Sequence, residues 1–216
     1  NLVSETEHTF ALLLALARNI PTAHASLVAG EWDRKRFQGT ELNEKTLGLI
    51  GLGRIGQHVA YRAKAFGMKI LAFDPYLDAA AARRLDVELS EIEPLLRRSD
   101  VVSIHTPLTD QTRGLLDAAA ISRMKSGALL VNCARGGVVD EAAVLEALES
   151  GRLGGGAMDV FEPEPPPGSP LVGLPRVVVS PRLGGQRGGA RGRVAAEAAG
   201  GGGGGVGGSL GGAGGG

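Results

Sequence analysis

Residues 46–60 read TLGLIGLGRIGQHVA, and this stretch decides the fold of the chain. It begins with an apolar run of strand length, passes through a glycine-rich turn and continues as a helix pattern. Gly51, Gly53 and Gly56 fit the spacing G-x-G-x-x-G. That spacing is a weak signal alone, but here it lies between a strand and a helix, and the next apolar run ends at Asp74. The combination predicts a strand–helix–strand unit that binds a dinucleotide.

Each member of this motif has a chemical task in such a unit. Gly51 would permit the tight turn, Gly53 would let backbone N–H groups approach a pyrophosphate, and Gly56 would let helix and strand pack closely. The N-terminus of the helix then faces the anion. Asp74 would accept hydrogen bonds from ribose hydroxyls and repel a 2′-phosphate, which favours NAD over NADP. The alternative is an ordinary tight turn with an unrelated aspartate.

Strand and helix patterns alternate along the rest of the chain. We expect strands at residues 46–51, 68–74, near 87, and at 101–104, 128–133, 155–160 and 177–180. Near-continuous apolar strands separated by helices predict an α/β fold with a doubly wound parallel sheet of the Rossmann type, covered on both faces. Such a sheet places its ligand crevice at the carboxyl ends of the strands.

Capping residues and prolines predict where the helices begin and end. Ser4–Glu7 and Ser90–Glu93 both have capping-box spacing, so a helix should start near each serine. The first helix should end before Pro21, which can open a second, short helix. Asp140 should cap a helix in the second half of the chain.

Composition narrows the possible partners and the compartment. The 216 residues are 43% hydrophobic, and Lys plus Arg and Asp plus Glu both number 23. No charge excess points to nucleic acid, and the apolar run Phe10–Ala17 is too short to span a bilayer. The lone Cys133 excludes an internal disulfide and fits a reducing compartment. We therefore expect a cytoplasmic protein without a membrane partner.

Charged residues follow the predicted strands at their carboxyl ends. Arg135 comes after strand 128–133, Asp159 lies at the end of strand 155–160, and Glu164 lies in the proline-rich loop beyond it. An arginine fork suits a substrate carboxylate, and a carboxylate such as Glu164 suits the orientation of a general base. On spacing alone, solvated loop charges explain these residues equally well.

Several segments, in this order, resemble the D-isomer-specific 2-hydroxyacid dehydrogenases: SETEHTFALLLALARNI, KTLGLIGLGRIGQHVA, HTPLTDQTRGLL, NCARGGVVDEAAVLEAL, GGGAMDVFEPEP and LPRVVVSP. The resemblance covers Asn1 to Gly185 and is strongest to the phosphoglycerate-oxidising branch of that family. It implies an NAD-dependent oxidoreductase whose intact form oxidises 3-phosphoglycerate to 3-phosphohydroxypyruvate in serine biosynthesis, without a metal. It also implies a nucleotide-binding domain whose substrate-binding domain is missing, and copies that pair as a homodimer or larger homo-oligomer.

The resemblance assigns cofactor contacts motif by motif. Arg54 and Ile55 of GLGRIG would contact the pyrophosphate, and Asp74 of AFDPY would hold the adenosine ribose. The nicotinamide half would be lined by residues from three later motifs, namely Thr106 of HTPLT, Cys133 and Ala134 of NCARGG, and Asp159 of MDVF near the ring.

The resemblance also assigns the reacting groups. Arg135 would bind the 2-hydroxy acid, and Glu164 would pair with a catalytic histidine in the pattern S/T-P-H-x-G-G. This sequence reads Ser-Pro-Arg-Leu-Gly-Gly there, so Arg182 occupies the position of the base. Arginine stays protonated and cannot accept the hydroxyl proton, which favours a second hypothesis: a catalytically impaired NAD-binding module or sensor. His105 is the rival base, and His8 is expected at a surface or hinge.

Domain boundaries follow from the same comparison. Residues 1–189 are predicted to form the NAD-binding domain, and residues 1–37 within it to be helices at interdomain or dimer contacts. Residues 190–216 form a glycine-rich tail that we expect to be disordered. The chain begins at Asn1, and we interpret it as the internal part of a longer protein. The Arg/Gly-rich stretch 184–193 could bind RNA, but it lacks interleaved aromatics, so we expect no nucleic-acid partner.

Overall fold

Seven parallel strands form one sheet in the order β3-β2-β1-β4-β5-β6-β7 in this computed structural model, which describes residues 1–186. The order reverses between β1 and β4, and at such a switch point a crevice opens beyond the carboxyl ends of the strands. The predicted doubly wound parallel sheet is therefore confirmed. The strands are β1 (Thr46–Ile50), β2 (Lys69–Phe73), β3 (Glu88–Leu89), β4 (Val101–Ile104), β5 (Ala128–Asn132), β6 (Leu153–Met158) and β7 (Val177–Val179).

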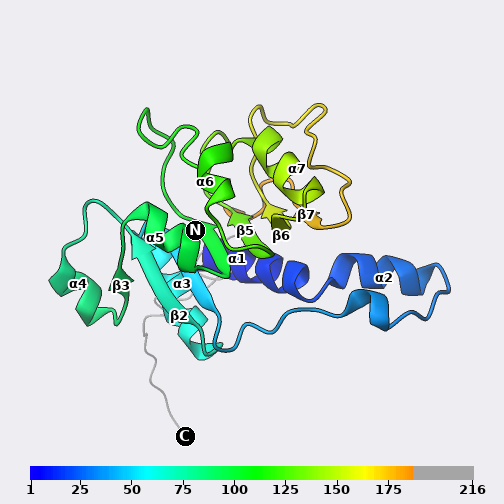
Figure 1. Cartoon of the computed structure of the whole chain (residues 1–216), viewed down its shortest axis with the longest axis horizontal. Helices are drawn as coiled ribbons and strands as arrows, with labels where there is room; N and C mark the ends of the chain where they lie inside the picture. The colour runs from blue at the N-terminus through cyan, green and yellow to red at the C-terminus, as the bar shows by residue number, and fades with distance from the viewer. Residues whose placement is uncertain (187–216) are drawn as a thin grey trace, which may run out of the picture. The chain divides into compact units, whose positions relative to one another are not determined.

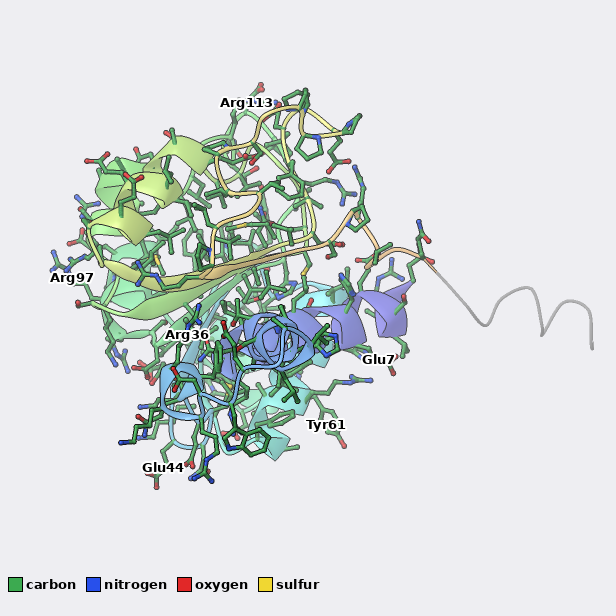
Figure 2. All side chains as sticks on the ribbon, turned by 90° about the vertical axis from the view of Figure 1, so that its right-hand side faces the viewer. Glu7, Arg36, Glu44, Tyr61, Arg97 and Arg113 are labelled. Atoms are coloured by element: carbon green, nitrogen blue, oxygen red, sulfur yellow. The ribbon has the colours of Figure 1, made fainter. Side chains whose placement is uncertain are left out.

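Helices cover both faces of the sheet and create a separate apolar core on each (Figure 2). On one face α1 (Leu2–Ala17) packs beside α3 (Arg54–Ala65). The other face is covered by α5, α6 and α7, and α4 lies next to β3 near the sheet edge. The sheet is thus buried on both sides, which explains why its strands are almost wholly apolar. The bounds of these last four helices are α4 (Ala79–Arg84), α5 (Ile92–Arg98), α6 (Ala118–Ser122) and α7 (Glu141–Glu149).

Helix α2 (Ile20–Val28) projects away from the sheet together with the loop that follows it (Figure 1). This projecting arm, residues 20–37, includes a short 3₁₀ helix at Lys35–Phe37. Its large apolar side chains are exposed, Leu27 to 58%, Val28 to 74% and Trp32 to 77%. Within residues 1–186 no single helix passes as a membrane span by length and apolar character; α1 and α2 pass only as a pair, with a 60° bend between them.

The helices begin near the predicted residues, and Pro21 lies in the first turn of α2 as predicted, but two of the three predicted caps are wrong. Asn1 precedes α1, and Ser4 lies inside it, donating instead to the carbonyls of Gly184 and Gln186. Ser90 also caps nothing, because the N-cap of α5 is the next residue and its side chain makes no capping bond. Asp140 does cap α7, accepting from the N–H groups of residues 142 and 143. The predicted tail at 190–216 lies outside the described residues.

Candidate cofactor and substrate site

The glycine turn between β1 and α3 is held by very close backbone contacts. Gly51 has φ 94°, and a Cβ on it would lie 2.8 Å from the carbonyl of His105. A Cβ on Gly56 would lie 2.3 Å from the carbonyl oxygen of Gly51. Both distances are too short for any side chain, so these glycines are required by the packing of turn, helix and strand β4.

Gly53 is a glycine for a different reason. A Cβ on it would meet no protein atom within 4 Å, and its φ of −67° is open to any residue. The protein therefore leaves space in front of Gly53, which is the N-cap of α3, and the first N–H groups of that helix lie beside the space. Arg54 is exposed at the same place and Ile55 is half-buried. This open cradle at a helix N-terminus fits a pyrophosphate.

Asp74 is fixed next to this cradle by backbone donors. Its Oδ2 accepts from the Leu52 N–H at 2.8 Å, and its Oδ1 accepts from the Tyr76 N–H at 2.9 Å. The bond from Leu52 connects the carboxylate directly to the glycine turn. A ribose placed in the crevice would therefore meet a carboxylate whose position is set by the same turn that receives the phosphates.

A cavity of about 350 Å³ contains several of the predicted residues. Gly51, Gly53, Asp74 and Thr106 all line it, so the structure brings these together as expected. Sequence reasoning missed Tyr76 and the part of the loop after β4 that follows Thr106, although that part directly continues the HTP motif. The missed lining residues include Thr109, Gln111 and Thr112.

His105 lines the same cavity at the end of β4. Burial lowers its pKa to about 4, so the ring is neutral at neutral pH. Its Nε2 lies 2.9 Å from the Ser103 hydroxyl. The ring is thus bonded within the strand end, which supports a role as a crevice-lining residue.

The turn after β5 carries Cys133, Ala134 and Arg135. Buried Asn132 holds it, accepting from the Ala134 N–H at 3.1 Å and donating to the Arg135 carbonyl at 2.9 Å. Burial, followed by smaller contributions that include the nearby charge of Asp159, raises the pKa of the Cys133 thiol to about 12. The thiol is therefore protonated and unsuited to nucleophilic chemistry. Arg135 is exposed and its guanidinium donates to the Ala134 carbonyl.

Arg182 and Glu164 meet in an ion pair between Nη1 of the arginine and Oε2 of the glutamate. Residue 182 has a left-handed φ of 54°, within a turn that follows β7. The other glutamate oxygen accepts from the Phe161 N–H at 3.2 Å. In the described part of the chain, no hydrogen bond or ion pair joins Arg135 to either residue. The structure thus brings two of the three predicted reacting groups together.

Asp159 follows β6 and is buried, with Ser180 and His8 beside its carboxylate. Neither of these two neighbours was singled out as a site residue from the sequence. His8, expected at a surface or hinge, is half-buried with its Nε2 3.0 Å from Asp159 Oδ1. No local pattern in the sequence indicates this contact, which joins residues 151 positions apart.

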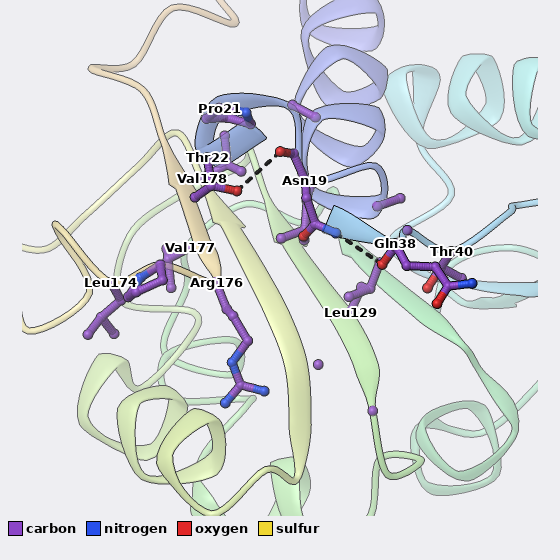
Figure 3. Close-up of a pocket in the computed structure, with 17 residues that line it drawn as sticks. Asn19, Pro21, Thr22, Gln38, Thr40, Leu129, Leu174, Arg176, Val177 and Val178 are labelled. Carbon is purple, nitrogen blue, oxygen red and sulfur yellow. Dashed lines mark hydrogen bonds between the residues drawn. The ribbon is translucent and has the colours of Figure 1, made fainter. Parts of the chain in front are cut away.

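A second cavity, of about 220 Å³, lies at the opposite edge of the sheet, where β5, β6 and β7 begin (Figure 3). Asn19, Thr22 and Gln38 line it, and hydrogen bonds connect Asn19 to the other two. No predicted site residue lines this cavity. Among residues 1–186 there is no group of three or more His, Cys, Asp or Glu side chains that could hold a metal ion.

Comparison with known proteins agrees with this geometry. The model of the family "D-isomer specific 2-hydroxyacid dehydrogenase, NAD binding domain" matches residues 10–184. The chain belongs to this family. Because the matched domain is an NAD-binding one, the predicted cofactor is confirmed as NAD.

Relatives of this dehydrogenase domain include curated and solved proteins. D-3-phosphoglycerate dehydrogenase of Bacillus subtilis is 49% identical over 184 residues, which are 85% of this chain and 35% of that protein. The enzyme of the same name from Methanocaldococcus jannaschii is 52% identical, covering 84% and 35%. D-lactate dehydrogenase from Aquifex aeolicus, solved with NAD and lactic acid, has a TM-score of 0.82 at 31% identity, covering 92% of this chain and 64% of that one. The chain thus spans about a third of the length of its curated relatives.

Proposed function

We propose that this chain is the NAD-binding part of a dehydrogenase that oxidises 3-phosphoglycerate to 3-phosphohydroxypyruvate. The observation that carries the proposal is the cradle at Gly53, open to a ligand and flanked by the fixed carboxylate of Asp74. NAD, when bound, supplies the hydride acceptor for oxidation of a 2-hydroxy acid. The choice of substrate is supported by curated relatives about half identical to the chain, whose name is D-3-phosphoglycerate dehydrogenase.

The chain's own residues would divide the remaining work. Arg135, exposed after β5, would bind the substrate carboxylate through its guanidinium fork. Glu164 would hold the side chain at position 182, as its ion pair with Arg182 illustrates. A substrate-binding domain would supply the other contacts to the substrate, since the chain spans 35% of the length of that relative.

The Arg182–Glu164 ion pair favours a second candidate function, an NAD-binding module or sensor without turnover. An arginine that stays protonated cannot take the hydroxyl proton, although it can attract an anionic substrate or polarise a carbonyl. Cofactor binding would then persist while the chemical step is impaired.

Two measurements on one protein separate the candidates. NADH fluorescence titration measures cofactor binding, and phosphoglycerate-dependent NADH formation measures turnover, both in a protein that carries this domain together with a substrate-binding domain. Binding with turnover supports the dehydrogenase, and binding without turnover supports the sensor. Failure to bind NADH would contradict both.

A cytoplasmic homodimer completes the proposal. The exposed apolar residues of the projecting arm, Leu27, Val28 and Trp32, support a contact between copies. Light scattering should give a dimer for the unaltered chain and a monomer for Leu27→Glu combined with Trp32→Glu. Tyr61→Glu, equally exposed but on α3, is the matched control and should leave the dimer intact. A monomeric unaltered chain would contradict this part of the proposal.

A further inference from the structure

His8 reaches from α1 into the turn after β7. Its side chain is 18% exposed, and its Nε2 lies 3.0 Å from Asp159 Oδ1 and 2.9 Å from the hydroxyl of Ser180. The carboxylate that it meets is 2% exposed. A histidine buried against a carboxylate on a neighbouring segment connects two distant parts of the chain, here residues 8 and 159.

The Asp159 carboxylate anchors the turn formed by residues 180–184. Its Oδ1 also accepts from the Ser180 hydroxyl at 2.6 Å and from the Leu183 N–H at 2.8 Å, and its Oδ2 accepts from the Gly184 N–H at 2.9 Å. With His8, three donors point at Oδ1 and one at Oδ2. Asp159 is therefore engaged in holding the turn.

Donor and acceptor roles fix the state of the His8 ring. The Asp159 carboxylate can only accept a hydrogen bond, so the hydrogen between it and His8 must be on Nε2 of the histidine. The Ser180 hydroxyl already donates its hydrogen to Asp159, so in its contact with His8 it accepts. His8 thus donates from Nε2 toward both oxygen atoms. Ser4, one turn earlier on α1, donates to the Gly184 carbonyl of the same turn, but only His8 donates to the carboxylate from α1 among the described residues. Without His8, Asp159 Oδ1 and the Ser180 hydroxyl lose a donor.

The sheet order places this turn relative to the cofactor. A sheet with its switch point between β1 and β4 has two halves, each of which takes one mononucleotide. Asp74, beside the glycine turn, belongs to the half that receives the adenosine ribose. Residues 159 and 180–184 follow β6 and β7, on the other half, where the nicotinamide end lies.

We propose that His8 is a positioning residue for the nicotinamide end of the cofactor. It acts through Asp159 and Ser180, which hold the turn 180–184 against α1 at that end of the crevice. The inference rests on the proposed binding of NAD by this chain. It gives α1, which also contacts this turn through Ser4, a role at the nicotinamide end of the site.

The test compares two ligands that differ only at this end. NAD carries the nicotinamide, whereas ADP-ribose lacks it and keeps the rest. In the full 216-residue chain, His8→Leu should weaken NAD binding about tenfold, the change that ~1.4 kcal/mol produces, and leave ADP-ribose binding unchanged. Calorimetric titration measures both. His24→Leu, the same substitution at an exposed position on α2, is the matched control and should change neither affinity.

A second variant separates positioning from folding. His8→Gln retains an N–H donor at a similar reach and should recover most of the NAD affinity. The role of His8 would be overturned if His8→Leu lowered the affinities for NAD and ADP-ribose equally, or if it left the NAD affinity unchanged. If the unaltered chain binds neither ligand, the proposed function is wrong and this role is wrong with it.

Discussion

The two ends of the crevice are built in different ways. At the cofactor end, backbone groups do the work: Gly51 and Gly56 are pressed against carbonyls, and Asp74 is fixed by two N–H donors. At the reacting end, Glu164 and Arg182 are side chains on loops, 27% and 53% exposed, that contact each other. We expect substitution of Gly51 or Gly56 to disturb the fold, and substitution of Glu164 or Arg182 to alter the proposed chemistry and leave the fold in place.

This difference explains how one residue can depart from the family pattern while the domain keeps its form. The turn at 180–184 is held by Asp159 through the main chain, and this anchoring needs no particular side chain at residue 182. Arg182 takes a left-handed φ of 54° there and still reaches Glu164. The fold therefore does not depend on which side chain stands at residue 182.

Restoring the base should have the largest effect. Arg182→His, in a protein that carries this domain together with a substrate-binding domain, should raise phosphoglycerate turnover by about 10²–10⁴, the usual contribution of a general base. The imidazole would accept the hydroxyl proton and Glu164 would orient it. Steady-state kinetics measure the gain. Arg182→Gln removes the charge without supplying a base and should give none; equal turnover in both variants would contradict the account.

The cofactor end can be tested with two glycines three positions apart. Gly53→Ala should fold normally, because no protein atom lies within 4 Å of the new Cβ, yet weaken NADH binding about tenfold or more by filling the cradle. Gly56→Ala places its Cβ 2.3 Å from the Gly51 carbonyl oxygen and should lower the free energy of unfolding by about 1–3 kcal/mol. Denaturant unfolding and fluorescence titration of both variants should separate packing from binding. Normal NADH affinity in Gly53→Ala would show that the cradle is not the phosphate site.

Local sequence predicted the cofactor end because its determinants are local. The motif at 51–56 and the strand around it contain the turn, the helix start and the space for phosphate. Ser4 and Ser90 show the limit of such reasoning: both have capping-box spacing and cap nothing. Ser4 instead bonds to Gly184 and Gln186, partners that lie far along the chain and that no local pattern reveals.

The reacting end was only partly predictable for the same reason. Its resemblance to the family brought Glu164 and position 182 together, and the ion pair confirms that they lie side by side. The contact between His8 and Asp159 spans 151 residues and depends on where α1 packs. Sequence spacing contains no information on that packing, so His8 was expected at a surface or hinge.

Acid should destabilise the cofactor end through His105. Its pKa is lowered by burial from 6.5 to about 4, so the unfolded chain binds a proton first as the pH falls. The free energy of unfolding should therefore fall by about 2 kcal/mol between pH 7.5 and pH 5 from this group. Urea unfolding at both pH values measures the change.

His105→Asn should reduce the change of the unfolding free energy with pH, whereas His24→Asn, at an exposed position, should not. The half-buried Asp100 and the ion-paired Glu88 have lowered pKa values. They add their own loss of stability at more acid pH, below their ordinary pKa values of 4.5 or less. The change in the free energy of unfolding above pH 5 can therefore be assigned to His105. An unchanged slope in His105→Asn would show that the ring titrates alike in both states.

The smallest effect should come from breaking the Arg182–Glu164 ion pair. Both side chains are substantially exposed, and ion pairs in that setting contribute about 0–1 kcal/mol. Glu164→Gln should therefore change the free energy of unfolding by less than about 1 kcal/mol and leave NADH binding intact.

Asp159→Asn is the comparison variant. It removes the charge of a buried carboxylate that accepts hydrogen bonds from four donors. Because hydrogen bonds to charged groups contribute about 1.5–3 kcal/mol, this substitution should lower the free energy of unfolding by more than Glu164→Gln does. A larger loss for Glu164→Gln than for Asp159→Asn would mean that the reacting end is part of the fold, and the contrast between the two ends would disappear.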